Sequence, residues 1–261
     1  MLKFSIITPS YNQGKYIEDT IRSVLDQNYS NFEHIIFDNK STDNTLDVLN
    51  KYVHLIWKSE KDNGQTNAIN KGLKIASGDI LCYLNSDDIL ASGTLKFVAE
   101  YFENNNEVDL IYGNCTLIDV KGKTIKIRKP EEFNLNRLLY LGYSYIQQPS
   151  TFFRKSIIED IGYFDGSLKY VMDYDYWIRA AKGGKILKYI DRNLSFMRIH
   201  KEAKTFASNK EMFLEAFNVS KRNGGNKLIR YHLHYLFWYI LNSFPGLFKF
   251  LFNIRNKRKI K

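Results

Sequence analysis

Strand and helix patterns alternate through the first 100 residues of this chain. Runs rich in β-branched and aromatic residues, which favour strands, occupy residues 3–8, 34–37, 54–57 and 80–88. Between these runs, apolar residues recur at helical spacing in 15–27, in the segment carrying Leu46, Leu49 and Val53, and in 66–76. This alternation is typical of a parallel sheet with helices on its faces. We therefore predict an α/β protein whose strands present their carboxyl ends along one edge.

The fourth run, ILCYLNSDD, ends in two adjacent carboxylates, Asp87 and Asp88. In open α/β sheets, ligands bind beyond the carboxyl ends of the strands, where both acids are expected. Adjacent carboxylates repel unless they share a cation, and Mg²⁺ is commonly held by one or two carboxylates together with substrate phosphates. The alternative is that the pair only caps the next helix, since Asp is a good N-cap. Taken alone, the pair favours the cap.

Two further polar sites are predicted at the same edge, Thr8 to Asn12 after the first strand and Asp38 after the second. A lone Asp after a strand is more often a turn former than a ligand contact. Three polar sites on one edge reverse those odds and indicate a binding site. Ser41 or Thr42 is expected to cap the helix that follows Asp38.

The pattern changes after a helix predicted at about 93–104. Strands at 108–113, 115–119 and 123–129 predict antiparallel hairpins and hence a mixed sheet. The later elements predicted are a helix at 135–141, a loop at YIQQPSTFFRK that Pro149 interrupts, helices at KSIIEDIG and MDYDYWIRAAKGG, and a strand at 186–200 that ends at His200.

Asp173 and Asp175 lie in the first turn of the helix predicted from MDYDYWIRAAKGG. Two acids there suit the helix dipole, so a purely structural role is an even alternative for each. His200 stands alone, and a lone histidine is usually a satisfied surface or core group.

With 261 residues, 44% of them apolar and 15% aromatic, the chain is long enough to bury a full core. Cys82 and Cys115 lie in apolar segments without metal-ligand spacing, so no disulfide framework is implied and a reducing compartment fits. The start, MLKFSIITPSYN, has too short an apolar run for a signal peptide. We expect the protein in the cytoplasm.

The whole excess of positive charge lies at the C-terminal end. Of the 38 Lys and Arg, ten fall in residues 221–261, which contain no Asp or Glu, and this leaves 28 basic residues to balance the 28 acidic ones in residues 1–220. A neutral body argues against a nucleic-acid-binding module, which would place cations and aromatics along a binding surface. The sequence therefore predicts a globular body with a cationic appendage and no nucleic-acid partner.

Residues 233–254, LHYLFWYILNSFPGLFKFLFNI, are densely apolar, but Pro245 and Gly246 divide them. Neither half reaches the ~20 residues that a transmembrane helix needs. Short apolar segments flanked by basic residues fit helices lying in the interface of an anionic membrane. The alternative is that they pack on the globular domain. We favour the membrane, so residues 206–261 are predicted to be a helical, basic segment that holds the protein peripherally on the inner face of the plasma membrane.

Five motifs resemble, in order and spacing, those of the inverting glycosyltransferases of family 2: FSIITPSYN, FDNKSTDNT, SEKDNGQTNAINKGLKIASGDILCYLNSDD, MDYDYWIRAAKGG and FMRIH. The resemblance spans roughly residues 3–205 and implies the GT-A fold, a Rossmann-like, mainly parallel mixed sheet flanked by helices. It implies a transferase domain at 1–205, with a nucleotide-sugar half at about 1–112 and an acceptor half at about 113–205.

The resemblance also implies roles for single residues. Asp88 matches the direct ligand of Mn²⁺ or Mg²⁺ in the DxD-type motif, and Asp173 matches the catalytic base. The residues matched to nucleotide or diphosphate contacts are Thr8, Pro9, Tyr11 and Asn12 in the first loop, Asp38 for the base of the nucleotide, Asp62, Asp87 and His200.

Four positions depart from the family pattern. Asn39 and Lys40 stand where acidic residues or glycine are common, and Asn67 stands where Asp is frequent, so contacts to the nucleotide and the donor sugar are expected to differ. Met172 replaces the Glu that often precedes the base, so a neighbouring acid that tunes the pKa of Asp173 is not implied here.

The activity implied is transfer of a sugar from a nucleoside-diphosphate sugar, most commonly a UDP-sugar, to an acceptor hydroxyl with inversion. The implied acceptor is a glycan or a lipid-linked molecule, and cell-envelope polysaccharide or lipopolysaccharide is its destination by analogy. The remaining alternative is a catalytically silent relative that scaffolds an assembly at a membrane. Intact Asp38, Asp88 and Asp173 argue against it.

Overall fold

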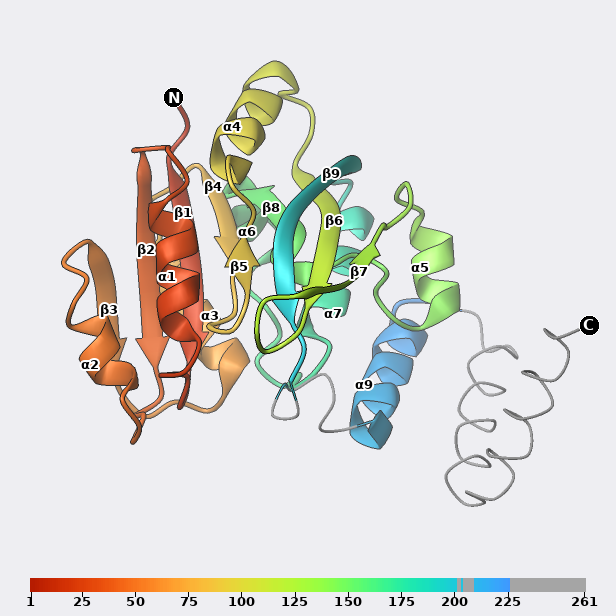
Figure 1. The fold of residues 1–261 in the computed structure, drawn as a ribbon. Helices are drawn as coiled ribbons and strands as arrows, with labels where there is room; N and C mark the ends of the chain where they lie inside the picture. Colours follow the sequence, from red (N-terminus) through yellow and green to blue (C-terminus); the bar gives the residue numbers. More distant parts are fainter. Residues whose placement is uncertain (201–202, 204–208, 226–261) are drawn as a thin grey trace, which may run out of the picture.

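The computed structural model describes residues 1–200, 203 and 209–225. The first part alternates strand and helix as the sequence predicts (Figure 1): β1 (Phe4–Ser10), α1 (Ile17–Leu25), β2 (Phe32–Asp38), α2 (Thr45–Leu49), β3 (Leu55–Ser59), α3 (Gln65–Ile75) and β4 (Ile80–Tyr83). These four strands pair in parallel. The carboxyl ends of β1, β2 and β4 therefore meet on one edge of the sheet, as predicted.

The second part mixes strand directions. Its elements are β5 (Ile89–Leu90), α4 (Thr94–Asn104), β6 (Leu110–Ile118), β7 (Thr124–Arg128), α5 (Leu135–Leu141), a 3₁₀ turn (Gln148–Ser150), β8 (Thr151–Arg154), α6 (Ser156–Ile161), α7 (Met172–Lys182), β9 (Leu187–Arg198) and α9 (Asn209–Arg222). β8 runs antiparallel to β4 and β6, whereas β6 and β9 are parallel. The described strands form one sheet in the order β3-β2-β1-β4-β8-β6-β9-β5, with β7 beside β6, which confirms the mixed sheet.

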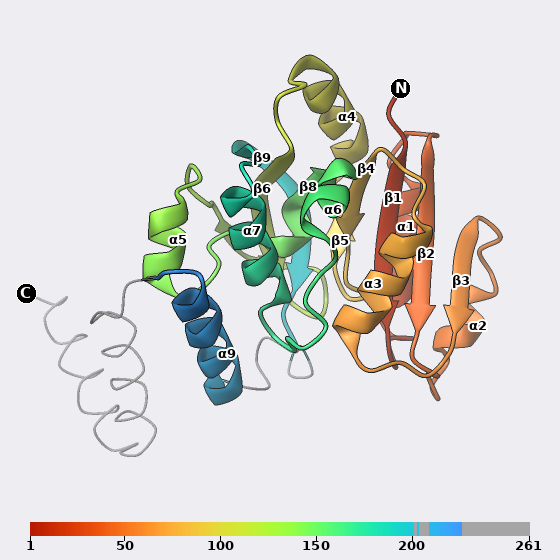
Figure 2. The ribbon, with the colours of Figure 1, turned by 180° about the vertical axis from the view of Figure 1, so that it is seen from behind.

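Each face of the sheet is covered by its own helices. α3, α6 and α7 pack on one face, which Figure 2 shows from the front, while α1 and α4 cover the other (Figure 1). Successive side chains of a strand point to opposite faces. Ile7 and Leu81 therefore enter the core beneath α3 and α7, whereas their neighbours Ile6 and Cys82 enter the core beneath α4.

The interpretation of YIQQPSTFFRK as a loop is wrong, because β8 runs through the middle of the sheet. Pro149 lies in the 3₁₀ turn directly before the strand, where its missing N–H removes no ladder hydrogen bond. Phe152 and Phe153 are both buried, one in each core. Here a proline marks where a strand begins.

The two strands predicted at 108–113 and 115–119 are one strand, β6. Gly113 separates the apolar runs without ending the strand. A Cβ at Gly113 would lie 2.6 Å from Leu194, and the register between β6 and β9 shifts there, so the glycine permits the close approach of β9.

Two predictions about α2 are also wrong. The helix ends at Leu49, and Val53, expected on its inward face, is fully exposed. Neither Ser41 nor Thr42 caps it, since its N-cap is Asn44. The Ser41 hydroxyl and N–H donate instead to the Asp38 carboxylate. Ser41, although it lies near the start of a helix, thus hydrogen-bonds to the last residue of the preceding strand.

In the part of the chain that the structure describes, no helix has the length and apolar character needed to cross a membrane. Residues 226–261 lie outside the described residues, so the membrane-associated appendage stays a prediction. The predicted boundary near residue 112 falls inside β6, and the division of residues 1–205 into two halves also stays a prediction.

Candidate functional site

A cavity of about 850 Å³ opens at the edge where β1 and β4 end. The loops after β1 and β4 line it, as do the start of α7 and one side of α9. Of the predicted site residues, those that line the cavity are Pro9, Tyr11, Asn12, Asp62, Asp87, Asp88 and Asp173. Thr8, Asp38 and His200 are buried and do not belong to its lining.

The chain turns shortly after β4, at residues 85–88, which we call the acid turn. Asp88 N–H donates to the carbonyl of Asn85 (3.1 Å), which closes the turn. The chain then enters β5, which pairs with β9, and α4 begins only at Thr94. The alternative in which Asp87 and Asp88 cap a helix is therefore wrong. The β5–β9 pairing also brings Arg198 over the acid turn.

Asp88 is the more buried of the two acids, with 2% of its surface exposed. Its Oδ1 accepts a hydrogen bond from Arg198 N–H (3.1 Å), and its Oδ2 accepts one from Asn85 Nδ2 (3.2 Å). Burial, and then the charge of Asp87, raise the pKa of the Asp88 carboxyl well above its ordinary value. A cation beside the pair would counter both effects.

Asp87 pairs with the histidine that follows β9. Oδ2 of Asp87 lies 2.9 Å from Nε2 of His200, whose ring packs against Tyr16 with the ring centroids 4.9 Å apart. The structure thus brings His200 to the acid turn, behind Asp87. Its second nitrogen, Nδ1, is buried without a hydrogen-bond partner among the described residues.

The acid turn fits a hard divalent cation. Mg²⁺ takes one or two carboxylates from a protein and fills its remaining positions with water and substrate phosphates. Within residues 1–200, 203 and 209–225, no three His, Cys, Asp or Glu side chains form a ready-made metal cluster. Asp88 and Asp87 supply the donor set of a site that the substrate would complete.

The loop after β1 is tied to the loop after β2. Asn12 has a left-handed backbone, with φ of 52°, and its N–H donates to Ser41 Oγ (2.7 Å) while its Oδ1 accepts from Thr42 N–H (2.8 Å). Below the loop, Oγ1 of Thr8 lies 2.9 Å from Nε2 of the buried His34. These contacts fix the wall of the cavity that Asn12 lines.

Asp38 does not line the cavity but holds residues around it by hydrogen bonds. It is 1% exposed, and its carboxylate accepts hydrogen bonds from Ser41 and from Ser59 Oγ (2.7 Å). Its neighbour Asn39 lines the cavity and accepts the N–H of Asp62 (2.8 Å). Burial raises the pKa of the Asp62 carboxyl. Contacts of Asp38 and Asp62 with a nucleotide stay predictions.

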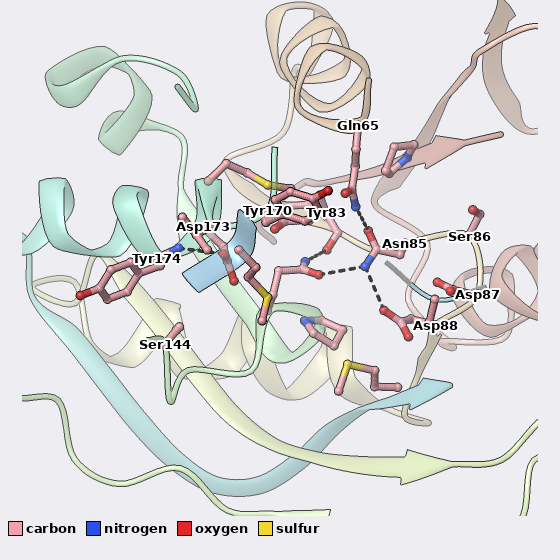
Figure 3. Close-up of a pocket in the computed structure, with 18 of the residues that line it drawn as sticks. Gln65, Tyr83, Asn85, Ser86, Asp87, Asp88, Ser144, Tyr170, Asp173 and Tyr174 are labelled. Atoms are coloured by element: carbon pink, nitrogen blue, oxygen red, sulfur yellow. Dashed lines mark hydrogen bonds between the residues drawn. The ribbon is translucent and has the colours of Figure 1, made fainter. Parts of the chain in front are cut away.

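Asp173, the second residue of α7, lies at the opposite end of the cavity from Asp87 and Asp88 (Figure 3). Its Oδ1 accepts the N–H of Tyr174 (2.8 Å). Tyr83, the last residue of β4, lies near both ends: burial, then the charges of Asp173 and Asp88, raise the pKa of its phenol. The cavity therefore has the carboxylates of Asp87 and Asp88 at one end and that of Asp173 at the other.

A chain of amide side chains that the sequence did not single out as a site joins the acid turn to the middle of the cavity (Figure 3). Gln65 Nε2 donates to Asn85 Oδ1 (2.7 Å), and Asn85 Nδ2 reaches Gln148 Oε1 (3.3 Å). Gln148 Nε2 in turn donates to the carbonyl of Tyr83 (2.5 Å). The available signal was the pair of glutamines before Pro149, which indicated only hydrogen-bonding capacity.

α9 holds the segment that precedes α7. The Glu215 carboxylate accepts the backbone N–H groups of Lys169 (2.8 Å), Tyr170 (2.7 Å) and Val171 (3.1 Å). These donors lie directly before α7, which begins at Met172, so Glu215 fixes the segment that leads into the helix. Sequence reasoning missed Glu215, because no local pattern connects it with Asp173.

The described fold is shared with solved glycosyltransferase structures. TarS of S. aureus in complex with UDP-GlcNAc matches with a TM-score of 0.68 at 23% identity, over 88% of this chain and 69% of that one. The mannosyltransferase PcManGT from Pyrobaculum calidifontis, in complex with GDP-Man and Mn²⁺, matches with a TM-score of 0.60 at 15% identity, over 92% and 80% of the two chains. The chain has the GT-A fold, as predicted.

Sequence comparison then defines the family. The sequence model of glycosyl transferase family 2 matches residues 5–162. A PGL/p-HBAD biosynthesis glycosyltransferase of Mycobacterium bovis is 31% identical over 183 residues, 68% of this chain and 69% of its own length. An uncharacterized glycosyltransferase of Methanocaldococcus jannaschii is 26% identical over 232 residues, 85% and 80% of the two chains. The chain belongs to glycosyl transferase family 2, which confirms the resemblance.

Proposed function

We propose that this chain is an inverting, metal-dependent glycosyltransferase that moves a sugar from a nucleoside-diphosphate sugar to an acceptor hydroxyl. The observation that carries the proposal is the position of Asp88 and Asp173 at opposite ends of one cavity, with Tyr83 between them (Figure 3). One carboxylate then serves the leaving group and the other serves the nucleophile. Membership of the family supports this division of roles.

At the donor end, Asp88 with Asp87 beside it would hold Mn²⁺ or Mg²⁺. When bound, the ion neutralises the negative charge that develops on a diphosphate leaving group. The chain orients the Asp88 carboxylate through Asn85 Nδ2 and Arg198 N–H, while His200 does the same for Asp87. These contacts fix both carboxylates before a substrate arrives.

At the acceptor end, Asp173 acts as the general base. A hydroxyl is a poor nucleophile until a carboxylate within hydrogen-bond reach takes its proton. The N–H of Tyr174 holds one oxygen of Asp173 in place (2.8 Å). Attack from the face opposite the leaving group inverts the anomeric carbon, and no covalent enzyme intermediate is required.

The donor we propose is a UDP-sugar, bound along the loop after β1 and beside Asn39 and Asp62. TarS is described with UDP-GlcNAc and PcManGT with GDP-Man, which supports a nucleoside-diphosphate sugar as the donor class. Asp38 accepts hydrogen bonds from Ser41, in the loop after β2, and from Ser59, at the end of β3. Its proposed contact with the base therefore depends on how these two residues hold it.

We also propose a peripheral position on the inner face of the membrane, with a cell-envelope glycan or lipid-linked acceptor. The support is the basic, aromatic sequence of residues 227–261. The full chain should co-sediment with anionic vesicles at low salt, while a chain ending near Asn226 should stay in the supernatant and still bind donor. If both stay in the supernatant, the membrane proposal is wrong.

A panel of sugar nucleotides tests the activity. A ligand that binds only the native state raises its melting temperature. We expect one UDP-sugar to raise it in the presence of Mn²⁺ and not in the presence of EDTA, and UDP to be released when an acceptor is added. Binding without release would favour the silent scaffold, and a panel in which no sugar nucleotide binds would contradict the proposal.

A further inference from the structure

The two ends of the cavity differ in polarity. Beside the carboxylates of the acid turn, the lining includes the amide of Asn85, which hydrogen-bonds to Gln65 and Gln148, and Arg198 with its apolar neighbours Met197 and Ile199. Around Asp173, which lies on the same side as Ser144 in Figure 3, the lining is mostly apolar. We call this second part the apolar end; it is lined by Tyr143, Ile146, Val171, Met172, Met212, Phe213 and Ala216.

We propose that the apolar end binds an alkyl or aryl group that the acceptor carries next to the hydroxyl to be glycosylated. The inference rests on the proposed function, because it takes Asp173 as the base for that hydroxyl. It adds the chemical class of the acceptor: an apolar body joined to a hydroxyl-bearing part. Burial of such a body against apolar side chains favours binding roughly in proportion to the area removed from water.

The wall formed by α9 is fixed to the rest of the domain. Glu215 accepts three backbone N–H groups from residues 169–171, and Arg222 donates to Asp175 Oδ1 (2.7 Å). Asp175 is 1% exposed and also pairs with Arg179 (2.8 Å). α9 is thereby joined to both the start and the body of α7, so Met212 and Phe213 face the cavity from a rigid support.

The test compares two glucosides that share a sugar ring and differ in the aglycone, phenyl β-D-glucoside and methyl β-D-glucoside. Their dissociation constants from the full chain would be measured by NMR titration in the presence of UDP and Mn²⁺. We expect the phenyl compound to bind about tenfold more tightly, because only its ring removes apolar surface from water. Equal affinities would overturn the inference.

Phe213→Ser should reduce the affinity for phenyl glucoside to that for methyl glucoside. Leu214→Ser is the matched control: it is the next residue of α9, is 45% exposed and does not line the cavity, so it should leave both affinities unchanged. If Leu214→Ser weakens binding as much as Phe213→Ser does, the phenyl group binds elsewhere and the inference is wrong.

A second pair of variants needs no change in the core. Tyr143 is 53% exposed and lines the apolar end, whereas Tyr140 is 48% exposed and does not line the cavity. Tyr143→Ala should weaken phenyl glucoside binding severalfold and Tyr140→Ala should not; equal effects would count against the apolar end. The affinity for UDP, measured in wild type and in every variant, tests the proposed function separately. If the wild-type chain does not bind UDP, the proposed donor site is wrong. The preference for phenyl glucoside over methyl glucoside is then judged by itself.

Discussion

The donor end and the acceptor end of the cavity are built by different means. At the donor end, Asp38 ends β2 and Asp88 follows β4, two of the four parallel strands of the sheet, and strand register sets where they lie. At the acceptor end, Asp173 lies in the first turn of a helix, and Glu215 of α9 holds the segment directly before that helix. α9 lies beyond residues 5–162, the part that matches the family. The comparison teaches that the site we propose for the donor is built mainly on the ends of strands, while the site we propose for the acceptor depends on contacts between two helices that lie outside the matched residues.

The largest expected effect is at the donor end. Asp88→Asn should abolish metal-dependent transfer, because the amide removes the negative charge that a divalent cation needs. Its cost in stability should be limited to about 1–3 kcal/mol, because the amide loses one of the two hydrogen bonds that the Asp88 carboxylate accepts, while burial already opposes ionisation of that carboxyl. Transfer assays at increasing Mn²⁺, beside circular dichroism melting, would measure both. Full activity in the variant would remove Asp88 from the site, and the proposed donor end would then be wrong.

The matching change at the acceptor end is Asp173→Asn. Loss of a general base should lower the rate of transfer by about 10²–10⁴-fold. The dissociation constant of the donor should stay unchanged, because Asp173 and Asp88 lie at opposite ends of the cavity. Isothermal titration with the sugar nucleotide, beside the transfer assay, separates the two quantities. A collapse of donor affinity would assign Asp173 to the donor pocket instead.

The same contrast explains how far the sequence could predict the structure. The alternation of apolar runs and helical patterns predicted β1 to β4 and placed Asp38, Asp87 and Asp88 on one edge. Local pattern failed where a residue's partners lie far along the chain. β8 was interpreted as a loop because Pro149 precedes it, although strands β4 and β6 on both sides stabilise it.

The functional groups follow the same rule. The motif around Asp173 was readable as the start of a helix with an acid in its first turn. The carboxylate that fixes this start comes from Glu215, and no periodicity or spacing connects the two segments. The family pattern would have put an acid at Met172, directly before the base. The structure instead brings an acidic side chain to the start of α7 from another helix.

A smaller effect is expected from Glu215→Gln. A single amide oxygen cannot accept three N–H groups as a carboxylate does, so the segment before α7 should loosen and misplace Asp173. We expect the turnover number to fall about tenfold with donor affinity unchanged, and the free energy of unfolding to fall by about 1–3 kcal/mol. Steady-state kinetics and urea denaturation would measure these.

Glu211→Gln is the control for that variant. Glu211 lies one turn earlier on α9 and accepts a hydrogen bond from the Tyr170 hydroxyl (2.9 Å), a side-chain contact that leaves the backbone of residues 169–171 untouched. Its turnover number should stay within about twofold of wild type. Equal losses in the two variants would mean that general destabilisation of α9, and not the position of Asp173, explains the effect of Glu215.

The smallest expected effect concerns acid, and it again separates the two ends. His34 is fully buried under the loop after β1, which we call the donor loop. Its Nε2 lies 2.9 Å from Thr8 Oγ1, and its Nδ1 has no partner among the described residues. Burial, with a lesser contribution from His54, lowers the pKa of His34 to about 3 from its ordinary 6.5. Between these two values the unfolded chain binds a proton that the folded chain does not. The free energy of unfolding should therefore fall as the pH drops below about 6.5, by up to about 1.4 kcal/mol per pH unit.

Other groups titrate in the same range, and the raised pKa of the Asp88 carboxyl contributes a slope of opposite sign, because folded Asp88 holds its proton more tightly than the unfolded chain does. The informative quantity is thus the difference between wild type and His34→Gln, in which the contribution of Asp88 cancels. Urea denaturation from pH 7 to pH 5 should show a steeper loss of stability in wild type than in His34→Gln. The difference in slope should approach the value for one proton bound by the unfolded chain and not by the folded one. Parallel pH profiles for the two chains would show that His34 is protonated in the folded protein, which would mean that the donor loop is more open to water than its contacts with Thr8 and Ser41 imply.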